Sequence, residues 1–404
     1  MSPDVLVIGA GPAGATAART LALSGARVRL LDRARFPRNK PCGGAISMRV
    51  LRRFPHLVAA IARISHARLS RLHLESPSGR SVLVESTTPA ALMIRRVEYD
   101  ALLTRLAVEA GVELVEGVEI TQAEESPAGV SLRARDGRRF LAPLAIAADG
   151  VYSVVARRLG LNQGWRAGAL ALDMMEETPS ETLRSAEPDT LWVAYGYGGD
   201  EGYAYVFPKE AHVNVGIGYV LDYFRSRVAE TPYRRQAAFV EMLCRRGVLS
   251  GHSSKTHFTP YQIPVGGVLA RTASNRVLVA GDAGGFVNGI TAEGIYYAMV
   301  SGELAAQALT GRGPQEYPRM WGAEIGAELR DAVLVQRDLL KEPPRIDAAV
   351  GAAQSSHALA TRLIAYLMGE VSYASARRNL LLTAPAFVAR LLVHRLHRKA
   401  HAHS

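Results

Sequence analysis

Cys42 is one of only two cysteines in the chain, and it lies in the segment Lys40-Pro41-Cys42-Gly43-Gly44. A thiol can donate a proton or pair with another thiol. Pro41 is rigid, whereas Gly43 and Gly44 allow the backbone to pass close to a flat ring. Free cysteines are usually small buried residues, but this setting favours a place beside a bound ring. Cys42 is therefore a candidate catalytic residue.

A second chemical signal is a glycine turn near the N-terminus. The apolar run Asp4–Ile8 predicts a strand, the turn Gly9–Gly14 follows at once, and Ala15–Leu23 is typical of a helix. This order presents backbone N–H groups and a positive helix end to a pyrophosphate. Asp32 ends the next strand, Ala26–Leu31, where it can accept hydrogen bonds from ribose hydroxyls. The residues expected to hold the nucleotide here are Gly9, Gly11, Ala13, Gly14, Asp32 and Arg33.

Two later glycine-rich motifs also follow predicted strands. The apolar run Leu144–Ala148 leads into Asp149-Gly150, and Arg276–Ala280 leads into Gly281-Asp282 and then a glycine-rich loop up to Ile295. Open α/β sheets bind their ligands at the carboxyl ends of strands. We therefore expect all three motifs at one edge of one sheet.

Length, composition and charge restrict the classes of protein. A chain of 404 residues favours two intertwined domains, or one domain with a large insertion, over a single core. The net charge of +11 suits an anionic partner, but aromatic residues are sparse and no nucleic-acid motif occurs, so we expect no nucleic acid. The chain contains no run of about 18 uncharged apolar residues, so we expect no membrane-spanning helix. With two cysteines and no signal-peptide pattern, we expect a reduced, cytoplasmic protein without a metal site.

The three motifs together resemble the FAD-dependent family built on the para-hydroxybenzoate hydroxylase fold. The resemblance implies FAD as cofactor, with Asp282 at its ribityl hydroxyls. Arg96–Asp100 resembles the family's R-x-x-[FY]-D helix, whose arginine reaches the cofactor; the alternative is a solvated surface arginine. The further residues that the resemblance places at the cofactor are Cys42, Gly43, Gly44, Arg96, Asp149, Gly150, Asp282, Gly289, Ile290, Thr291, Gly294 and Ile295.

The segments between the motifs predict an inserted β-sheet domain. Leu69–Glu85 reads as a hairpin. Four more strands are predicted over Ala169–Met174, Thr190–Tyr195, Gly202–Phe207 and His212–Tyr219. We expect a Rossmann-type α/β FAD-binding domain from residues 1–70, 96–160 and 271–310. A mostly antiparallel substrate domain is expected from 71–95 and 161–270, and a helical C-terminal region from 311–404.

Two further segments resemble geranylgeranyl reductases. Phe36–Gly44 is similar to their FPR-x-KPCGG signature, and Gly202–Lys209 is similar to their YxWxFP segment, with Tyr205 in place of tryptophan. The resemblance implies hydride transfer from reduced flavin N5 to an isolated C=C bond of a prenyl chain, with a proton delivered to the other carbon. It places four residues at the substrate: Tyr203, Tyr205, Phe207 and Pro208.

The source of that proton is open. Cys42, Tyr205 and a water beside the flavin are the candidates, and Cys42 can alternatively pair with Cys244. Glu293 is expected to cap the helix that follows it, because the first turn of a helix favours an acid.

The classes of substrate and electron donor follow from the same resemblance, and a basic segment near the C-terminus bears on the location. The prenyl chain belongs to a lipid, a diphosphate, a chlorophyll precursor or a respiratory quinone, and the electrons come from NADPH, ferredoxin or a deazaflavin. The segment Ala384–Lys399 predicts a basic amphipathic helix at the anionic inner face of the cell membrane, or a helix packed on the protein itself. Two other functions stay open: an FAD monooxygenase or halogenase of the same fold, and a membrane-associated flavoprotein electron carrier.

Overall fold

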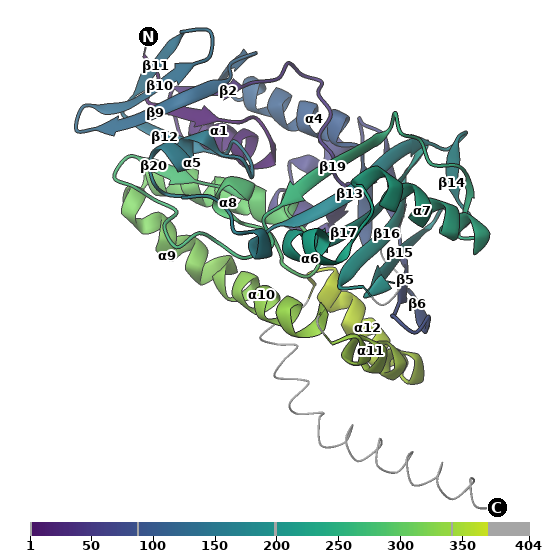
Figure 1. Ribbon diagram of the computed structural model, residues 1–404. Helices are drawn as coiled ribbons and strands as arrows, with labels where there is room; N and C mark the ends of the chain where they lie inside the picture. The colour runs from purple at the N-terminus through teal and green to yellow at the C-terminus, as the bar shows by residue number, and fades with distance from the viewer. Residues whose placement is uncertain (1, 87–88, 198–199, 341, 371–404) are drawn as a thin grey trace, which may run out of the picture.

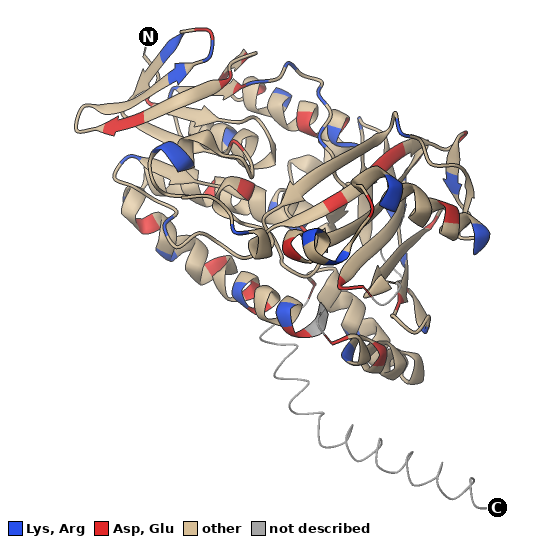
Figure 2. Cartoon of the chain, viewed as in Figure 1, with Lys and Arg blue, Asp and Glu red and all other residues tan. Residues whose placement is uncertain are grey.

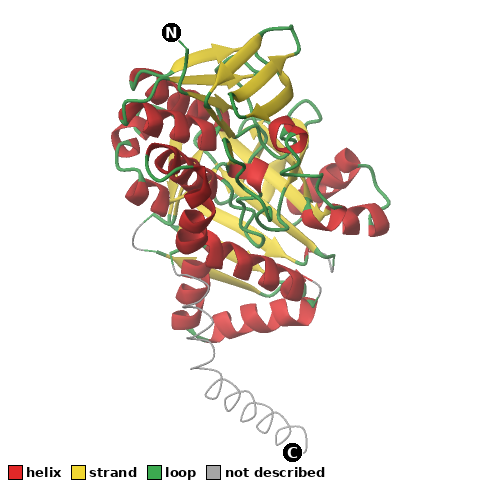
Figure 3. Cartoon of the chain, turned by 90° about the vertical axis from the view of Figure 1, so that its left-hand side faces the viewer, coloured by secondary structure: helices red, strands yellow, loops and turns green. Residues whose placement is uncertain are grey.

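The computed structural model describes residues 2–86, 89–197, 200–340 and 342–370, and two large β-sheets dominate it (Figure 1). In a second view, strands run through the middle of the molecule with helices on either side (Figure 3). None of the described helices combines the length and the apolar character that a membrane span needs.

The first sheet is parallel throughout and contains the strands that precede the glycine motifs. In spatial order it consists of β20 (Val277–Val279), β12 (Leu144–Ala147), β1 (Val5–Ile8), β2 (Val28–Asp32) and β8 (Glu113–Glu116). Every residue of β1 and β20 is buried, as expected for a parallel sheet covered on both faces. The predicted strands are confirmed, and the three motifs lie at one edge.

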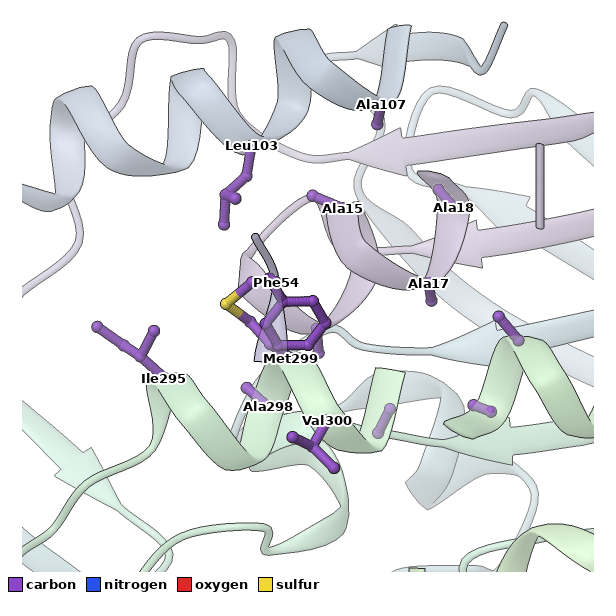
Figure 4. Close-up of a cluster of buried hydrophobic side chains, with 14 of the residues drawn as sticks. Ala15, Ala17, Ala18, Phe54, Leu103, Ala107, Ile295, Ala298, Met299 and Val300 are labelled. Carbon is purple, nitrogen blue, oxygen red and sulfur yellow. The ribbon is translucent and has the colours of Figure 1, made fainter. Parts of the chain in front are cut away.

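Three helices cover one face of this sheet: α1 (Pro12–Leu23), α4 (Arg96–Glu109) and α8 (Ile295–Thr310). Small residues let α1 and α8 approach closely, since a Cβ on Gly302 would lie 2.2 Å from the Ala13 carbonyl oxygen. Figure 4 shows this core, to which the three helices contribute Ala15, Ala17, Ala18, Leu103, Ala107, Ile295, Ala298, Met299 and Val300. The helix expected from the resemblance of Arg96–Asp100 is confirmed as α4.

A small antiparallel sheet and one short helix cover the other face. The sheet consists of β9 (Ile120–Ser126), β10 (Gly129–Ala134) and β11 (Arg139–Ala142), and the helix is α5 (Val154–Arg158). They bury Leu6, Ile8 and Leu31 from the outward side of β1 and β2. The parallel sheet is therefore enclosed, and only its carboxyl edge opens toward the second sheet.

The second sheet has seven strands, and all its pairings are antiparallel except that of β15 with β5. Its order is β19 (Phe258–Ile263), β13 (Ala171–Pro179), β17 (His212–Val220), β16 (Gly202–Pro208), β15 (Thr190–Tyr195), β5 (Arg71–Glu75) and β6 (Ser81–Glu85). The predicted hairpin and the four predicted strands are all present. β13 continues past its predicted end at Met174, because it pairs on both sides as far as Glu176.

Smaller elements complete the second half of the molecule. One face of the seven-stranded sheet packs against α6 (Leu221–Arg227) and α7 (Pro232–Arg245). The other packs against a three-stranded sheet and two C-terminal helices: β3 (Ala45–Ser47), β7 (Ala91–Ile94), β4 (His66–Leu69), α11 (Pro343–Ser355) and α12 (His357–Leu367). The remaining elements include α2 (Met48–Arg53), α3 (Leu57–Ile61), β14 (Leu183–Ser185), β18 (Leu249–Gly251), α9 (Tyr317–Trp321) and α10 (Ala327–Leu340).

The described part of the predicted helical C-terminal region, up to residue 370, is helical. α10 and α11 are separate helices, and Pro343 begins α11, where the missing N–H of proline costs nothing. The predicted membrane helix, Ala384–Lys399, lies outside the described residues. The strand pairing fits an inserted sheet, but the domain boundaries themselves stay a prediction.

Candidate active site

A single cavity of about 570 Å³ connects the two large sheets. Its wall includes the glycine turn after β1, the segment after β2, the loop before α8 and one face of β15 and β16. At the second sheet the lining is mostly apolar, with Leu72, Leu191, Val193, Ile263 and Val265. A volume in this range is typical of cofactor and substrate sites.

The glycine turn has the backbone geometry that a pyrophosphate site requires. Gly9 has φ +93°, and a Cβ on it would lie 2.3 Å from the Ala148 carbonyl oxygen. A Cβ on Gly14 would lie 1.8 Å from the Gly9 carbonyl oxygen. Above Gly11 the space is open, because a Cβ there would approach only Arg38 Nη2, at 3.7 Å. Side chains are thus excluded below the turn, while room and a cation lie above it, as a dinucleotide needs.

Asp32 and Asp149 follow their strands and are held by backbone N–H groups. Asp32 Oδ2 accepts from Ala10 N at 2.7 Å, and Oδ1 accepts from Ala34 N at 2.8 Å. Asp149 Oδ2 accepts from Val154 N at 2.9 Å and so caps α5. Burial raises the pKa of Asp149, although hydrogen bonds partly offset that rise. Among the described residues Asp149 Oδ1 has no hydrogen-bond partner, which suits a bound ligand with a donor.

The side chain of one asparagine, Asn288, holds the loop before α8 together through hydrogen bonds to the backbone. Asn288 Oδ1 accepts from the backbone nitrogens of Ile290 and Thr291, at 2.9 and 3.1 Å. Ala292 has φ +53°, a conformation that favours glycine, so alanine here carries some backbone strain. Asp282 lies beside this loop, and Lys40 Nζ is 3.7 Å from its Oδ2. The predicted flavin loop therefore forms a compact turn at the cavity wall.

The Cys42 loop crosses the cavity between the two sheets. The Cys42 carbonyl accepts from Asn214 Nδ2 at 3.2 Å, and its Sγ accepts from Gly44 N at 3.4 Å. Gly43 lies flat on Phe207, because a Cβ on it would be 2.8 Å from the ring. The loop is thus bound to β16 and β17, and Cys42 lines the cavity.

Cys244 does not share this site. It lies on α7 and packs against the outer face of the second sheet, whereas Cys42 packs against the core of the parallel sheet. Both thiols are free, and Cys244 is not among the residues that line the cavity. The arrangement does not support the alternative in which Cys42 pairs with Cys244.

Four aromatic rings form a continuous row, defined here as Tyr195, Tyr203, Tyr205 and Phe207. Their consecutive ring centroids are 5.2, 5.5 and 4.5 Å apart. The last three come from alternate positions of β16, so they share one face of the strand. Gly216 lies directly beneath Tyr205, since a Cβ there would be 2.3 Å from the ring. All four rings line the cavity, and Tyr195 donates a 3.3 Å hydrogen bond to the carbonyl oxygen of Ile290 in the predicted flavin loop.

Arg96 is buried at the bottom of the cavity and is only 5% exposed, so the surface-arginine alternative is wrong. Its Nε and Nη2 donate to the two carboxylate oxygens of Asp100, at 2.6 and 2.8 Å. Arg38 adds a third hydrogen bond to the same carboxylate, at 2.7 Å. Burial alone would raise the pKa of Asp100, but Arg96 and Arg38 lower it below its ordinary value. Asp100 therefore stays ionised and holds both guanidinium groups toward the cavity.

The expectation that Glu293 caps the next helix is wrong. Gly294 is the N-cap of α8, and that cap has no side-chain hydrogen bond. Glu293 instead accepts from Ser47 Oγ at 2.8 Å and from Arg49 Nη2 at 2.6 Å. Arg49 also contacts Glu328 of α10, at 2.9 Å. The Glu293 carboxylate thus pairs with Arg49, a cation distant in sequence, and this ion pair links the flavin loop to α2 and α10.

Sequence reasoning missed Asp173, which belongs to β13 and lines the cavity. It is 8% exposed, and Tyr205 donates a 3.1 Å hydrogen bond to its Oδ2. Burial raises the pKa of Asp173 to about 7, although Tyr205 and the charge of Lys40 both lower it. One signal was available: Asp173 is the one acid in the predicted apolar strand Ala169–Met174.

Nearly all predicted site residues line this one cavity. The exceptions are Gly14, which packs against Gly9 beneath the turn, and Pro208, which ends β16. The residues brought together are Gly9, Gly11, Ala13, Asp32, Arg33, Cys42, Gly43, Gly44, Arg96, Asp149, Gly150, Tyr203, Tyr205, Phe207, Asp282, Gly289, Ile290, Thr291, Gly294 and Ile295. Their contacts with cofactor and substrate stay a prediction.

Comparison with known proteins agrees with this geometry. A family model described as an FAD binding domain matches residues 2–310. Geranylgeranyl diphosphate reductase of Rhodobacter capsulatus is 31% identical over 76% of this chain and 75% of its own length. The chain belongs to the geranylgeranyl reductase family. Like the family, it is an FAD-dependent oxidoreductase, and the glycine turn and the unpaired Asp149 oxygen fit that cofactor.

Two further relatives have comparable similarity. Digeranylgeranylglycerophospholipid reductase 2 of Methanothermobacter thermautotrophicus is 29% identical over 84% of this chain and 88% of its own. Menaquinone reductase of Mycobacterium tuberculosis is 29% identical over 79% of each chain.

Solved structures confirm the predicted fold. A geranylgeranyl bacteriochlorophyll reductase-like protein from Thermoplasma acidophilum superposes with a TM-score of 0.78 at 21% identity, covering 94% of this chain and 98% of its own. A flavin-dependent brominase reaches 0.72 at 17% identity, covering 96% of this chain and all of its own. At these identities the likeness concerns the fold alone.

Proposed function

We propose that this protein saturates isolated C=C bonds in the prenyl chain of a lipid, diphosphate or quinone. When bound and reduced, FAD supplies a hydride from its N5 atom. The protein's own residues hold the cofactor at the glycine turn, position the chain and exclude water. An unpolarised alkene also needs a proton from a nearby acid.

One observation carries this proposal: the nucleotide turn and the aromatic row belong to the same cavity. A prenyl chain is flexible, apolar and regularly methylated, so it needs an extended apolar wall beside the reacting ring. The aromatic row and the neighbouring Leu191 and Val193 provide that wall. Gly43 brings the Cys42 loop against the same rings, which leaves the loop between the nucleotide and the chain.

The family relatives support the prenyl class without selecting a head group. Two of them are named for geranylgeranyl compounds and a third for menaquinone, which carries a prenyl tail. The head groups in these names differ, whereas the isoprenoid chain is shared. We therefore assign specificity to the chain that lies along the aromatic row.

The test is a direct search for saturated product. Dithionite-reduced holoprotein is incubated anaerobically with geranylgeranyl diphosphate, digeranylgeranylglycerophospholipid or menaquinone, and the masses of the products are measured by mass spectrometry. A mass gain of about two units for each double bond is expected. No gain with any of the three would contradict the proposal.

The same experiment separates this function from its two rivals. In an oxygenase or halogenase, substrate triggers the reaction of reduced flavin with oxygen, and the substrate gains oxygen or halide instead of hydrogen. An electron carrier would pass its electrons to another acceptor and leave the lipid unchanged. The fold is shared with a brominase, so product analysis decides between these reactions.

The electron donor and the membrane contact extend the proposal. We infer that NADPH, ferredoxin or a deazaflavin reduces the flavin, and bleaching of flavin absorbance by one of them identifies the donor. Basic and acidic residues are interspersed over the described elements (Figure 2). Residues 371–404, in contrast, contain no Asp or Glu and six basic side chains, Arg377, Arg378, Arg390, Arg395, Arg398 and Lys399.

That charge pattern fits a peripheral contact with an anionic bilayer, the source of a prenyl lipid. Each basic residue near the surface contributes on the order of 1 kcal/mol. We predict that deletion of residues 384–404 abolishes co-sedimentation with anionic liposomes, while the truncated protein still binds FAD. Unchanged co-sedimentation of the truncated protein would refute the membrane contact.

A further inference from the structure

The proposed reaction needs a proton donor, and Asp173 is an acid of the cavity wall that contacts the aromatic row. Asp173 lies on β13, the strand next to the edge of the second sheet, where β13 pairs with the edge strand β19 on one side and with β17 on the other. Its partners in register are Tyr261 and Gly218. Gly218 has no side chain, so the carboxyl group is not covered from β17.

The hydrogen bonding of Asp173 is incomplete for a charged group. Tyr205 donates to Oδ2 at 3.1 Å, but Oδ1 is buried and has no partner within the described residues. A buried carboxylate with one unsatisfied oxygen is costly, whereas a neutral carboxylic acid in the same place is tolerated. The geometry thus favours a stored proton on Asp173 near neutral pH, in agreement with its raised pKa of about 7.

The ionisable groups around Asp173 come from three elements. β16 contributes Tyr203 and Tyr205, β19 contributes Tyr261, and the segment before β3 contributes Lys40 and Cys42. Lys40 Nζ lies 4.4 Å from the centroid of the Tyr261 ring. The charge of Lys40, which also lies 3.7 Å from Asp282, favours the carboxylate left after proton transfer, and no second carboxylate acts on Asp173 among the described residues.

Tyr205 is better suited to hold the acid than to replace it. Burial and the neighbouring Asp173 raise the pKa of the Tyr205 phenol well above its ordinary value. A free phenolate at this position is therefore disfavoured. Its hydroxyl instead fixes the carboxyl group against the cavity wall, and its ring rests on Gly216.

We propose that Asp173 is the acid that protonates the alkene, with Tyr205 as its positioning residue; this assignment rests on the proposed prenyl reduction. The carboxyl O–H bond breaks, and a C–H bond forms at one alkene carbon. The neighbouring carbon takes the hydride of the reduced cofactor, so the substrate gains two hydrogens and two electrons. Solvent then returns a proton to the carboxylate.

Two variants and one control test the assignment in single-turnover reduction of geranylgeranyl diphosphate by dithionite-reduced holoprotein. Asp173→Asn should keep FAD bound and lower the rate on the order of 100-fold or more. The control is Glu176→Gln on the same strand, a buried acid that contacts Ser253 and Ser254 away from the cavity. It should reduce the substrate at the wild-type rate.

Tyr205→Phe should remain active, with a changed pH profile. The rate of the wild type should fall as pH rises through about 7, when Asp173 loses its proton. The Tyr205 hydrogen bond lowers the pKa of Asp173, so its removal should move this fall to higher pH. Loss of activity in Tyr205→Phe with full activity in Asp173→Asn would overturn the assignment and make Tyr205 the donor.

A readout independent of turnover is the thermal midpoint of the holoprotein. The folded pKa of Asp173 is raised above its unfolded value, so the folded state holds the proton between about pH 4 and about pH 7. Across that window the wild type should lose stability relative to Asp173→Asn as pH rises. A constant difference would contradict the assignment.

These outcomes distinguish the two proposals. Wild-type protein that yields no saturated product refutes prenyl reduction, and the role of Asp173 falls with it. Wild-type activity that survives in Asp173→Asn refutes only the assignment of the acid.

Discussion

At the nucleotide end of the cavity, close backbone contacts shape the glycine turn; at the substrate end, side chains from distant strands meet. The turn from Gly9 to Gly14 is contiguous, and its glycines contact their own neighbours in the parallel sheet. The Asp173–Tyr205 pair spans 32 positions, and the Glu293–Arg49 pair spans 244. The nucleotide end thus depends on glycines that lack side chains, whereas the other contacts depend on side chains from distant segments that come together. Substitutions should therefore act differently at the two ends.

The largest effect is expected at the backbone end. Gly14→Val would place a Cβ 1.8 Å from the Gly9 carbonyl oxygen, so the turn cannot keep its shape. We predict complete loss of bound FAD, measured as flavin absorbance per protein after purification. Gly168→Ala is the control, because nothing lies within 4 Å of its Cβ. FAD retained at full occupancy in Gly14→Val would contradict the backbone account.

The next effect concerns stability at the ion pair that links the flavin loop to α10. Arg49→Met leaves the partly buried carboxylates of Glu293 and Glu328 without their cation, which is itself buried. Breaking such a pair costs about 3–5 kcal/mol of unfolding free energy, measurable by urea denaturation of the holoprotein. Arg245→Ala removes an exposed pair with Glu241 and should cost less than about 0.5 kcal/mol. Equal losses in both variants would show that burial of the Arg49 network is unimportant.

A smaller effect is expected where the two kinds of wall meet, at Gly43. An alanine Cβ would lie 2.8 Å from the Phe207 ring, so the ring must move. Overpacking of this kind costs about 1–3 kcal/mol, and we expect lower kcat/KM for the prenyl substrate with FAD still bound. The double variant Gly43→Ala/Phe207→Leu should recover part of the loss. A wild-type kcat/KM in Gly43→Ala would separate the Cys42 loop from the substrate wall.

The smallest effect is predicted for Cys42→Ser. Serine preserves the size of the side chain but changes the 3.4 Å contact from Gly44 N to Sγ. If Asp173 is the acid, alkene reduction should slow by about tenfold or less, about 1.4 kcal/mol, with FAD bound as before. Single-turnover rates measure the change. Full turnover would make this loop a purely structural turn, and a loss as large as that of Asp173→Asn would restore Cys42 as the donor.

The same contrast explains what sequence reasoning found. The glycine turn, the Asp149-Gly150 and Gly281-Asp282 motifs and the Cys42 loop are local patterns, and each follows a strand or a proline that can be recognised directly. Their cavity position follows from parallel topology, which brings strand ends to one edge. The strands that precede the three glycine motifs were predictable from apolar runs, whereas β8, the small sheet of β9 to β11 and β19 were not predicted.

Residues that act in pairs from distant elements escaped prediction. Glu293 was interpreted as a helix cap because the helix that follows it can be predicted from the sequence. Its ion pair with Arg49, which is distant in sequence, cannot. Asp173 looked like one polar residue in an apolar strand, and its role depends on pairing between β13, β17 and β16. Local patterns do not contain that register.

The most direct test of the central claim uses one turnover. Holoprotein is reduced anaerobically, excess reductant is removed, and geranylgeranyl diphosphate is added while flavin absorbance and product mass are followed together. The account predicts flavin reoxidation matched by an equal amount of product heavier by about two mass units. Reoxidation only on addition of oxygen, with the prenyl chain unchanged in mass, would contradict it.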